Sequence, residues 1–595
     1  MGGLDYWLVH ARWTIPPSLA LWLAFRKLRT WRDVYKTCFL ITIAVTATIP
    51  WDSYLIRNRI WSYPDSSVVG PTLFAIPYEE IFFFFVQTYL TSSIYAVLTR
   101  PIVHAVLLPR TPSEGRAVRW TGTAVLFAVF ALAWTKLKEG GEGTYLALIV
   151  AWVAPFLTLL WFITSTHLRA MPRSTLVLAI LIPTIFLWEC DARALQRGTW
   201  VIEQGTKLGV SFRGLEIEEA VFFLLTNTMI VFGLAACDYC LAIHDIHRSY
   251  DRGTSSAFPP LREFGPILLN TPDETQRQRI EDLRAAIVIL SVHSKSFSTA
   301  SMVFDGRLRL DLLALYAWCR VCDDLVDNAS SVAAAEANIR LISSCLDLLY
   351  PPSSSSAISH PTRIPSKAIE AALPGLSEAE RGSFRLLSLL PITRPPLDEL
   401  LAGFETDLSF LAFAGSKAGE GEAVPRPSRI PSELPIKTDA DLLAYANNVA
   451  SSVADLCVQL VWAHCATAVP APEQRAILAA AREMGQALQL VNIARDVPAD
   501  LDIRRIYLPG RGLDTPVAAL TPDRRELLRR AREMAAHSRG AIERLPREAR
   551  GGIRAACDVY LSIGGAVDLA LDEGRVHERA RVAKGTRAWK MWKAL

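Results

Sequence analysis

Two eight-residue stretches decide the fold of the first part of this 595-residue chain. They read PYEEIFFF at residues 77–84 and EIEEAVFF at residues 216–223, so they lie 139 positions apart. Asp52 and Asp191 are separated by the same 139 positions, and a tryptophan follows each of them nine residues later. Equal spacing of several matched residues predicts an internal duplication.

Apolar segments of membrane-spanning length surround both stretches. A helix needs about 20 mostly apolar residues to cross the hydrocarbon core of a bilayer. Such segments lie near residues 4–24, 33–50, 76–98, 118–136, 143–165, 174–190 and 216–242. The sequence therefore predicts a seven-span helical membrane domain. Its two units, about 1–98 and 140–242, are four spans apart and have the same orientation, so the repeat is parallel rather than inverted.

The composition changes near residue 242. About 15% of residues 1–242 are charged, against about 24% of residues 243–595, and the mean hydropathy of the whole chain is +0.23. We expect residues 1–242 to form the membrane domain, 243–284 a linker, and 285–595 a soluble domain in which helical periodicity dominates. The net charge of +4 is too small to indicate a nucleic-acid partner.

Basic residues predict the orientation of the membrane domain. The segments 25–36 and 99–117 together carry eight Arg and Lys residues, and such loops face the cytosol. Seven spans then place the N-terminus outside and everything after residue 242 in the cytosol. We expect a multi-pass protein of the endoplasmic reticulum or another endomembrane, with the lipid bilayer as a partner.

Acidic residues near the membrane are the first candidate site. Carboxylates at membrane depth are costly and indicate function by default. A carboxylic acid in an apolar site holds a proton that can protonate an alkene, and aromatic faces stabilise the resulting carbocation. This chemistry suits a membrane-dissolved polyene; loop residues at the interface or ion ligands of a transporter are the alternatives. The candidate catalytic residues are Asp52, Glu79, Glu80, Asp191, Glu218 and Glu219.

The first unit resembles the fungal and archaeal type of lycopene β-cyclase. The P-W-D and P-x-E-E-x-x-F-F motifs of that family match residues 50–52 and 77–84. The second unit departs from it, with Glu189-Cys190-Asp191 in place of P-W-D and Glu216 in place of the proline. The resemblance covers about residues 1–242. It implies that the acids close β-rings on lycopene or a related carotene.

Two aspartate motifs mark the second candidate site. Residues 316–327 read YAWCRVCDDLVD, and residues 489–500 read QLVNIARDVPAD. Residues four apart share one face of a helix, so Asp323 and Asp327 lie together, as do Asn492, Asp496 and Asp500. Their hard oxygen ligands suit Mg²⁺ and a substrate phosphate. A single D-x-x-x-D is more often a solvated helix face, but two such motifs in apolar helices predict a metal site.

This part of the chain is similar to the squalene and phytoene synthase family of all-α isoprenoid synthases, over about 285–595. The matching segments are 295–297, 316–327, 403–407, 445–450 and 489–509. The resemblance implies Mg²⁺, or Mn²⁺, and no redox cofactor. The metal would be held by Asp323, Asp327, Asn492, Asp496 and Asp500. The diphosphate would be bound by Ser296, Tyr316, Arg320, Tyr445, Gln489, Arg495 and Tyr507.

The two resemblances occur in the order of the fused enzymes of carotenoid-producing fungi. They imply that two molecules of geranylgeranyl diphosphate are joined to 15-cis-phytoene through prephytoene diphosphate. A separate phytoene desaturase acts next, and the ends of lycopene are then cyclised to give γ-carotene and β-carotene. The alternative is a squalene-type synthase whose N-terminal domain is a membrane anchor or a transporter-like module.

Overall fold

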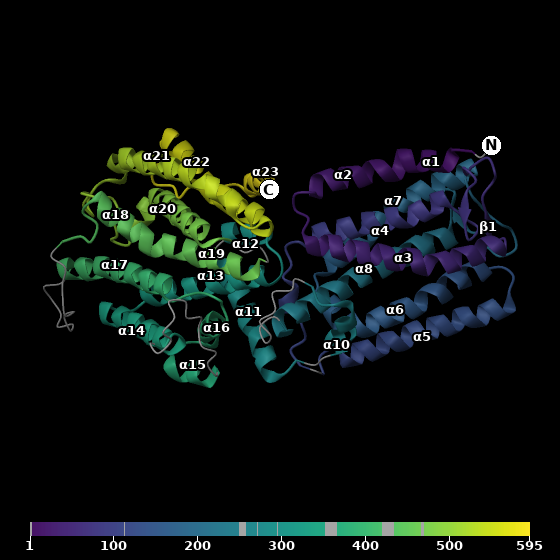
Figure 1. Ribbon diagram of the computed structural model, residues 1–595, viewed down its shortest axis with the longest axis horizontal. Helices are drawn as coiled ribbons and strands as arrows, with labels where there is room; N and C mark the ends of the chain where they lie inside the picture. Colours follow the sequence, from purple (N-terminus) through teal and green to yellow (C-terminus); the bar gives the residue numbers. More distant parts are fainter. Residues whose placement is uncertain are drawn as a thin grey trace. The chain divides into compact units, whose positions relative to one another are not determined.

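The computed structural model describes residues 3–111, 113–248, 258–269, 272–293, 295–351, 366–418, 433–465 and 469–595 (Figure 1). The described chain is mostly helical and forms two compact units. The first consists of Met1–Arg252 with Ser256–Arg277, and the second of Gln278–Leu595 with Gly253–Ser255. Residues 243–284, assigned to a linker from the sequence, contain η3 (His244–Arg248), η4 (Leu261–Glu263), α10 (Phe264–Leu269) and the start of α11 (Glu274–His293).

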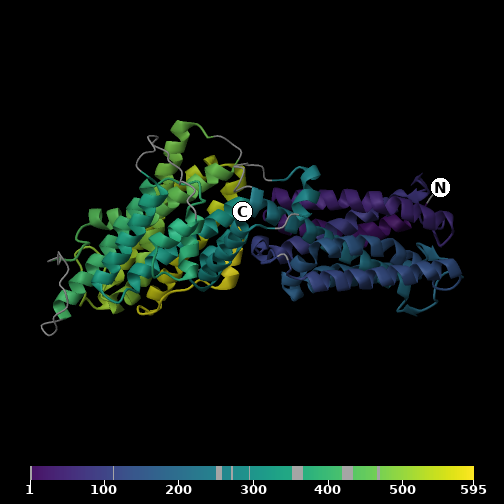
Figure 2. The same ribbon diagram turned by 90° about the horizontal axis from the view of Figure 1, so that it is seen from below.

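The first unit is a bundle of long helices that run along one common direction in both views (Figures 1 and 2). These helices are α3 (Trp31–Arg57), α4 (Tyr78–Thr99), α5 (Arg116–Glu139), α6 (Thr144–Ala170), α7 (Arg173–Arg197) and α8 (Ile217–Ile243). All six are long and apolar enough to cross a membrane. The outer face of α5 is strongly apolar and exposed, for example at Phe127 and Leu132, as expected of a helix surrounded by lipid.

The first predicted span differs from the other six. In place of one uninterrupted helix, the chain forms α1 (Asp5–Val9), a π-helical turn η1 (His10–Thr14) and α2 (Ile15–Phe25) in succession. Pro16 and Pro17 lie in the first turn of α2 and have no N–H to donate to the preceding turn. Six single helices of spanning length are found among the described residues. The seven predicted spans are therefore not confirmed exactly, because the first one, near residues 4–24, is made of three successive helical pieces.

The parallel repeat is confirmed by the short strands that precede α4 and α8. In the first unit of the repeat, β2 (Thr72–Leu73) pairs with β3 (Ile76–Pro77); in the second, β5 (Ser211–Phe212) pairs with β6 (Leu215–Glu216). The two-residue turns use positive φ angles at matched positions, 74–75 and 213–214, as tight hairpins of the right twist require. Each hairpin delivers its glutamate pair into the first turn of the following helix.

The two repeats share one core. β1 (Trp61–Ser62) pairs with β4 (Val201–Ile202), its counterpart in the other repeat. The Trp51 ring stacks on Trp152, with 4.5 Å between centroids, and on Phe222, with 5.6 Å. Deeper in the bundle, the Gln87 amide donates to the Thr226 hydroxyl at 2.8 Å. Both apolar and polar contacts thus hold the repeats together as a single body.

The second unit is built from helices, with no strand among its described residues. Most of the candidate site residues lie on α13 (Gly306–Asp327) and α20 (Ala471–Asp502), and α17 (Pro395–Ala418) is a further long helix of this unit. Pro498 lies inside α20 without ending it. The remaining elements are α12 (Lys295–Ser301), α14 (Val332–Leu349), α15 (Ser366–Ala372), α16 (Glu378–Leu387), α18 (Asp439–Ala446), η5 (Asn447–Ser451), α19 (Ser452–His464), η6 (Val517–Leu520), α21 (Thr521–Ser538), η7 (Arg539–Arg544), α22 (Arg547–Asp572) and α23 (Lys584–Ala594).

Candidate active sites

The first glutamate of each acidic pair binds a loop. One carboxylate oxygen of Glu79 accepts a hydrogen bond from the backbone N–H of Val69 at 2.8 Å. The corresponding oxygen of Glu218 accepts from the N–H of Leu208 at 2.6 Å. Val69 and Leu208 are again 139 positions apart. These two glutamates therefore fix the loops that enter α4 and α8.

The second glutamate of each pair binds tyrosine instead. Glu80 accepts hydrogen bonds from the hydroxyl groups of Tyr6 and Tyr63, the latter at 2.7 Å. Glu219 accepts one from Tyr145 at 2.5 Å. Tyr6 and Tyr145 occupy the same repeat position, so this contact is duplicated. The counterpart of Tyr63 is an isoleucine, so the second tyrosine of the first repeat has no equivalent.

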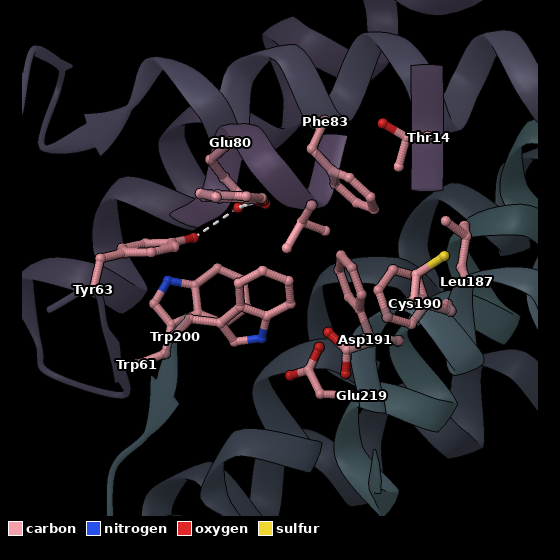
Figure 3. Close-up of a pocket in the computed structure, with 14 residues that line it drawn as sticks. Thr14, Trp61, Tyr63, Glu80, Phe83, Leu187, Cys190, Asp191, Trp200 and Glu219 are labelled. Carbon is pink, nitrogen blue, oxygen red and sulfur yellow. Dashed lines mark hydrogen bonds between the residues drawn. The ribbon is translucent and has the colours of Figure 1, made fainter. Parts of the chain in front are cut away.

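Both repeats line one pocket. Glu80 lies on one side of it, and Glu219 with Asp191 lies on the other (Figure 3). The pocket is otherwise lined mainly by aromatic and apolar side chains, among them Trp61, Tyr63, Phe83, Trp200, Phe222 and Phe223. Glu80 of the first repeat and Asp191 and Glu219 of the second thus line one shared pocket rather than two separate ones.

The two aspartates lie in unequal surroundings, although both are buried and interact electrostatically with Glu80 and Glu219. Asp191 lines the pocket and accepts a hydrogen bond from the Trp200 side chain. Asp52 is not among the lining residues, and neither of its carboxyl oxygens has a hydrogen-bond partner among the described residues. The two aspartates, although equivalent in the sequence repeat, therefore differ both in access to the pocket and in hydrogen bonding.

Sequence reasoning missed the three tyrosines of this site. Tyr6 and Tyr145 obey the 139-residue spacing, and that spacing was the signal that could have found them. Tyr63 obeys no such rule. It reaches Glu80 only because β1 pairs with β4 and turns the following residue toward the pocket.

In the second unit, α13 presents the first aspartate motif. Arg320 donates to Asp323 at 2.7 Å and also binds Asp324. Tyr316 stacks on Phe297 of α12, with 4.7 Å between ring centroids. Ser296 also lies in α12, but its side chain is outside the part of the structure that is described.

The second motif lies on α20. Arg495 donates to Asp496 at 2.5 Å, and Arg579 donates to the same carboxylate at 2.7 Å. Asn492 donates to the side-chain oxygen of Gln489 at 3.4 Å. The side-chain oxygen of Asn492 is buried without a hydrogen-bond partner among the described residues. Such an atom is available to a ligand.

Asp407 of α17 joins the two motifs, and sequence reasoning did not select it. It accepts hydrogen bonds from Tyr507 at 2.7 Å and from Tyr445 at 3.0 Å. Arg505, which sequence reasoning also left out, donates to Asp327 at 2.7 Å and acts on both Asp407 and Asp500. Both residues lie in segments that match the synthase family, 403–407 and 489–509, which was the available signal.

Crowding of the carboxylates perturbs their protonation. Burial, followed by the charge of Asp327, raises the pKa of Asp323 to about 7. Burial, followed by the charge of Asp496, raises the pKa of Asp500 to about 7. Burial also raises the pKa of Asp407 to about 6, although Arg505 opposes the shift. A divalent cation would relieve this repulsion.

The donor set fits Mg²⁺ that is shared with a substrate. Among the described residues, no three His, Cys, Asp or Glu side chains already form a metal cage. Mg²⁺ is usually held by one or two carboxylates together with waters and substrate phosphates, so a complete cage is not required. The two carboxylate motifs and the unpartnered Asn492 oxygen are suitable ligands.

Comparison with known proteins decides the family. Residues 290–586 match the squalene/phytoene synthase family, and residues 6–98 match the lycopene cyclase family. A bifunctional lycopene cyclase/phytoene synthase of Gibberella fujikuroi is 40% identical over 610 residues, which cover 100% of both chains. The chain belongs to the bifunctional lycopene cyclase/phytoene synthase family. A relative of the same name from Phaeosphaeria nodorum is also 40% identical, over 100% of this chain and 99% of its own.

The extent of one family match and a comparison with a solved structure add to the description of this bifunctional family member. The lycopene cyclase match ends at residue 98, and therefore covers the first repeat, in which both family motifs are intact. A crystal structure of a dehydrosqualene synthase with a ligand aligns at a TM-score of 0.37 with 20% identity, covering 53% of this chain and 96% of that one.

Proposed function

We propose that this chain catalyses two steps of carotenoid synthesis at two separate sites. The second unit joins two molecules of geranylgeranyl diphosphate to phytoene through prephytoene diphosphate. The first unit closes β-rings at the ends of lycopene. The cyclase assignment rests on one observation, which is that acids from both repeats line a single aromatic pocket. A solvated loop surface would not bury them there.

Ring closure needs an acid, a base and protection of a carbocation. A protonated carboxyl group of the pocket adds its proton to the terminal double bond. The neighbouring double bond attacks the cation, a carbon–carbon bond forms, and loss of a proton completes the ring. The faces of Trp61, Trp200 and the phenylalanines stabilise the positive charge by cation–π attraction. The reaction is an isomerisation and requires no redox cofactor.

The six acids predicted from the sequence divide into two groups in this proposal. Glu80, Glu219 and Asp191 line the pocket and act on the substrate, whereas Asp52 does not line it and interacts electrostatically with the two glutamates. Glu79 and Glu218 are positioning residues, because their carboxylates bind loop N–H groups.

The synthase reaction begins with departure of diphosphate. Asp323, Asp327, Asn492, Asp496 and Asp500 would hold Mg²⁺ or Mn²⁺, which would supply positive charge to neutralise the leaving diphosphate. Arg320 and Arg495 already lie at these carboxylates and supply cationic donors for the same diphosphate. Ser296, Tyr316, Gln489, Tyr445 and Tyr507 complete the proposed binding set. Tyr445 and Tyr507 contribute to this set through Asp407, to which each of them donates a hydrogen bond.

The helical bundle of the first unit also leads to a proposal about the location of the protein. We propose that the protein spans an endomembrane, such as that of the endoplasmic reticulum, with the synthase unit in the cytosol. The acid pocket lies at the start of α8, and the chain leaves the bundle after its end, 27 residues later. At 1.5 Å per residue this is roughly 40 Å. The pocket thus lies near one end of α8, and the chain leaves the bundle at the other end. A separate desaturase acts on phytoene before ring closure in this proposal.

One incubation tests both activities. Purified full-length protein in liposomes receives labelled geranylgeranyl diphosphate and Mg²⁺ without NADPH, and a parallel sample receives lycopene. We expect phytoene in the first sample and cyclic carotenes in the second. A cyclopropyl diphosphate as the only product of the first would contradict the phytoene synthase assignment. Unchanged lycopene in the second would contradict the cyclase assignment.

A further inference from the structure

The two halves of the cyclase site are not equivalent, although the sequence repeat makes them look alike. Glu80 accepts two tyrosine hydroxyl groups, and Glu219 accepts one. A hydrogen bond from a phenol favours the ionised form of a carboxyl group. The first repeat therefore offers a better-stabilised carboxylate than the second, and the difference is Tyr63.

The aspartates add to this difference. Asp52 is not among the residues that line the pocket, and its carboxyl oxygens have no hydrogen-bond partner in the described chain. Of the two acids in this half, Glu80 faces the pocket and has two hydroxyl donors, so it is better placed to carry a negative charge. Asp191 interacts most strongly with Glu219, and both line the pocket. Two neighbouring carboxyl groups in an apolar site cannot both ionise, so the pair of Asp191 and Glu219 retains a proton that faces the substrate.

We propose that the two repeats divide the proton transfers of cyclisation, with Glu219 as the proton donor and Glu80 as the proton acceptor. This inference rests on the proposed cyclase function. The proton of Glu219 forms the new C–H bond at C2 of the lycopene end, and the electron pair of the C5–C6 double bond forms the C1–C6 bond. Glu80 then removes the proton from C6, and the electrons of that C–H bond form the C5–C6 double bond of the β-ring.

The geometry suits this division. Glu80 and Glu219 lie on opposite sides of the pocket (Figure 3), so that an end group between them meets the donor on one side and the acceptor on the other. A carbocation is a very strong acid, and a carboxylate that two tyrosines stabilise is still basic enough to accept its proton. The hydrogen bond from Tyr145 stabilises Glu219 once its proton has left.

Each turnover moves one proton from Glu219 to Glu80 and leaves the total unchanged. The proton must return before the next cycle. Exchange of the carboxyl protons with solvent restores the proton on Glu219 and removes it from Glu80. In D₂O the donor therefore delivers deuterium.

Deuterium labelling separates the two roles. Full-length protein carrying Glu80→Gln or Glu219→Gln is reconstituted in liposomes with lycopene in D₂O, and the carotenes are analysed by mass spectrometry and NMR. The Glu80→Gln protein lacks the proton acceptor but keeps the donor, so it still protonates the substrate. The resulting cation then loses a proton and returns to lycopene. We expect deuterium in the recovered lycopene end groups, or rings whose double bond is misplaced, and at least a tenfold loss of β-rings. Without the donor, Glu219→Gln returns unlabelled lycopene.

Three results would overturn the assignment. The first is deuterium in the carotenes of the Glu219→Gln sample. The second is a Glu80→Gln sample with neither deuterium nor a misplaced double bond, and the third is the same result for both variants. Wild-type protein that forms neither rings nor deuterated lycopene would contradict the cyclase function itself, and this inference with it.

Milder variants keep the test valid if a glutamine variant does not fold. Tyr63→Phe removes one donor from Glu80 and should raise the ratio of deuterated lycopene to β-ring severalfold. Tyr54→Phe is the matched control, because Tyr54 is exposed on α3, and it should leave that ratio unchanged. An unchanged ratio in Tyr63→Phe would contradict the role of Glu80 as acceptor. Phytoene synthesis by the same preparations verifies the amount of intact protein.

Discussion

Glu80 and Glu219, 139 positions apart in the sequence, line the same pocket from the first turns of α4 and α8. A duplicated span pair therefore produced one two-sided site, with an acid at matched positions of each repeat. Neither repeat encloses the pocket alone, because aromatic residues from both line it. This relationship leads to predictions about single residues, about the order of products and about the separation of the two activities.

The two members of an acidic pair should respond differently to the same change. Glu79→Gln keeps an oxygen that accepts from Val69 N–H, so we expect a cyclase rate within about threefold of wild type. Glu80→Gln removes a charge that faces the pocket, and loss of one acid–base group costs about 100-fold or more. The rates are measured with lycopene in liposomes. Equal loss in both variants would contradict the division of the pair.

The structural role of Glu79 can be measured through the thermal stability of the cyclase. Glu79→Ala removes the carboxylate that accepts the hydrogen bond from the N–H of Val69, and a hydrogen bond contributes about 0.5–1.5 kcal/mol net. We expect a lower midpoint of thermal inactivation of the cyclase, whereas Glu79→Gln should stay near the wild-type midpoint. An unchanged midpoint in Glu79→Ala would show that the loop is held by other contacts.

A single shared pocket closes one ring at a time. Early in a time course with lycopene, a carotene with one ring should accumulate before the product with two rings, because the second end must enter after the first has left. Product analysis at a few per cent conversion measures the order. Two-ring product in the first turnovers, with no one-ring intermediate, would contradict a single site.

Much of the membrane site was predictable because duplication leaves a fixed spacing. Asp52 with Asp191 and Glu80 with Glu219 follow from the 139-residue offset alone. The spacing could not separate Glu79 from Glu80, because adjacent residues on a helix point in different directions and their partners lie in distant loops. It could not predict Tyr63 either, since the pairing of β1 with β4 places that residue. The π-helical turn at His10–Thr14 depends on backbone geometry that hydrophobic length does not record.

In the synthase unit, helical spacing predicted which aspartates share a face, but not what joins the two motifs. Asp407 lies on α17, about 80 residues from either motif, and its partners are Tyr445 and Tyr507. Arg320 and Arg495, expected to bind diphosphate, also bind the aspartates of their own helices. Such long-range contacts follow from packing rather than from any local pattern.

Asp407 should be important for the synthase alone. Asp407→Asn removes the charge that accepts from two tyrosine hydroxyl groups. Loss of hydrogen bonds to a charged group costs about 1.5–3 kcal/mol, so we expect roughly 10-fold to 100-fold slower phytoene formation at unchanged cyclase rate. Asp398→Asn, an exposed position on the same helix that pairs with Arg394, is the matched control and should retain its rate.

Metal removal should separate the two activities. A chelator should abolish phytoene synthesis and leave ring closure unchanged, because the proposed cyclase chemistry needs only proton transfer. The pKa values of Asp323 and Asp500, both about 7 without a cation, predict the effect of pH. Protons compete with the metal below this value, so the apparent affinity for Mg²⁺ should increase from pH 6 to pH 8.

The same shifts set the stability of the metal-free synthase unit. The folded-state pKa values lie above the unfolded value of about 3.9, so this contribution to stability is present at low pH and is lost as the pH rises through about 7. We expect the thermal midpoint in chelator to fall from pH 6 to pH 8, and added Mg²⁺ to raise it more at pH 8. A midpoint independent of pH would contradict the crowding of these carboxylates.

The central claim is that both repeats form one cyclase site that is independent of the synthase site. It is tested most directly by expressing full-length Glu80→Gln and Glu219→Gln separately in lycopene-producing cells and measuring β-ring carotenes and phytoene. The predicted result is that each single variant lowers β-ring formation at least tenfold, while phytoene synthesis stays at the wild-type level. Retention of about half of the β-ring formation by each variant would indicate two independent sites and would contradict the claim.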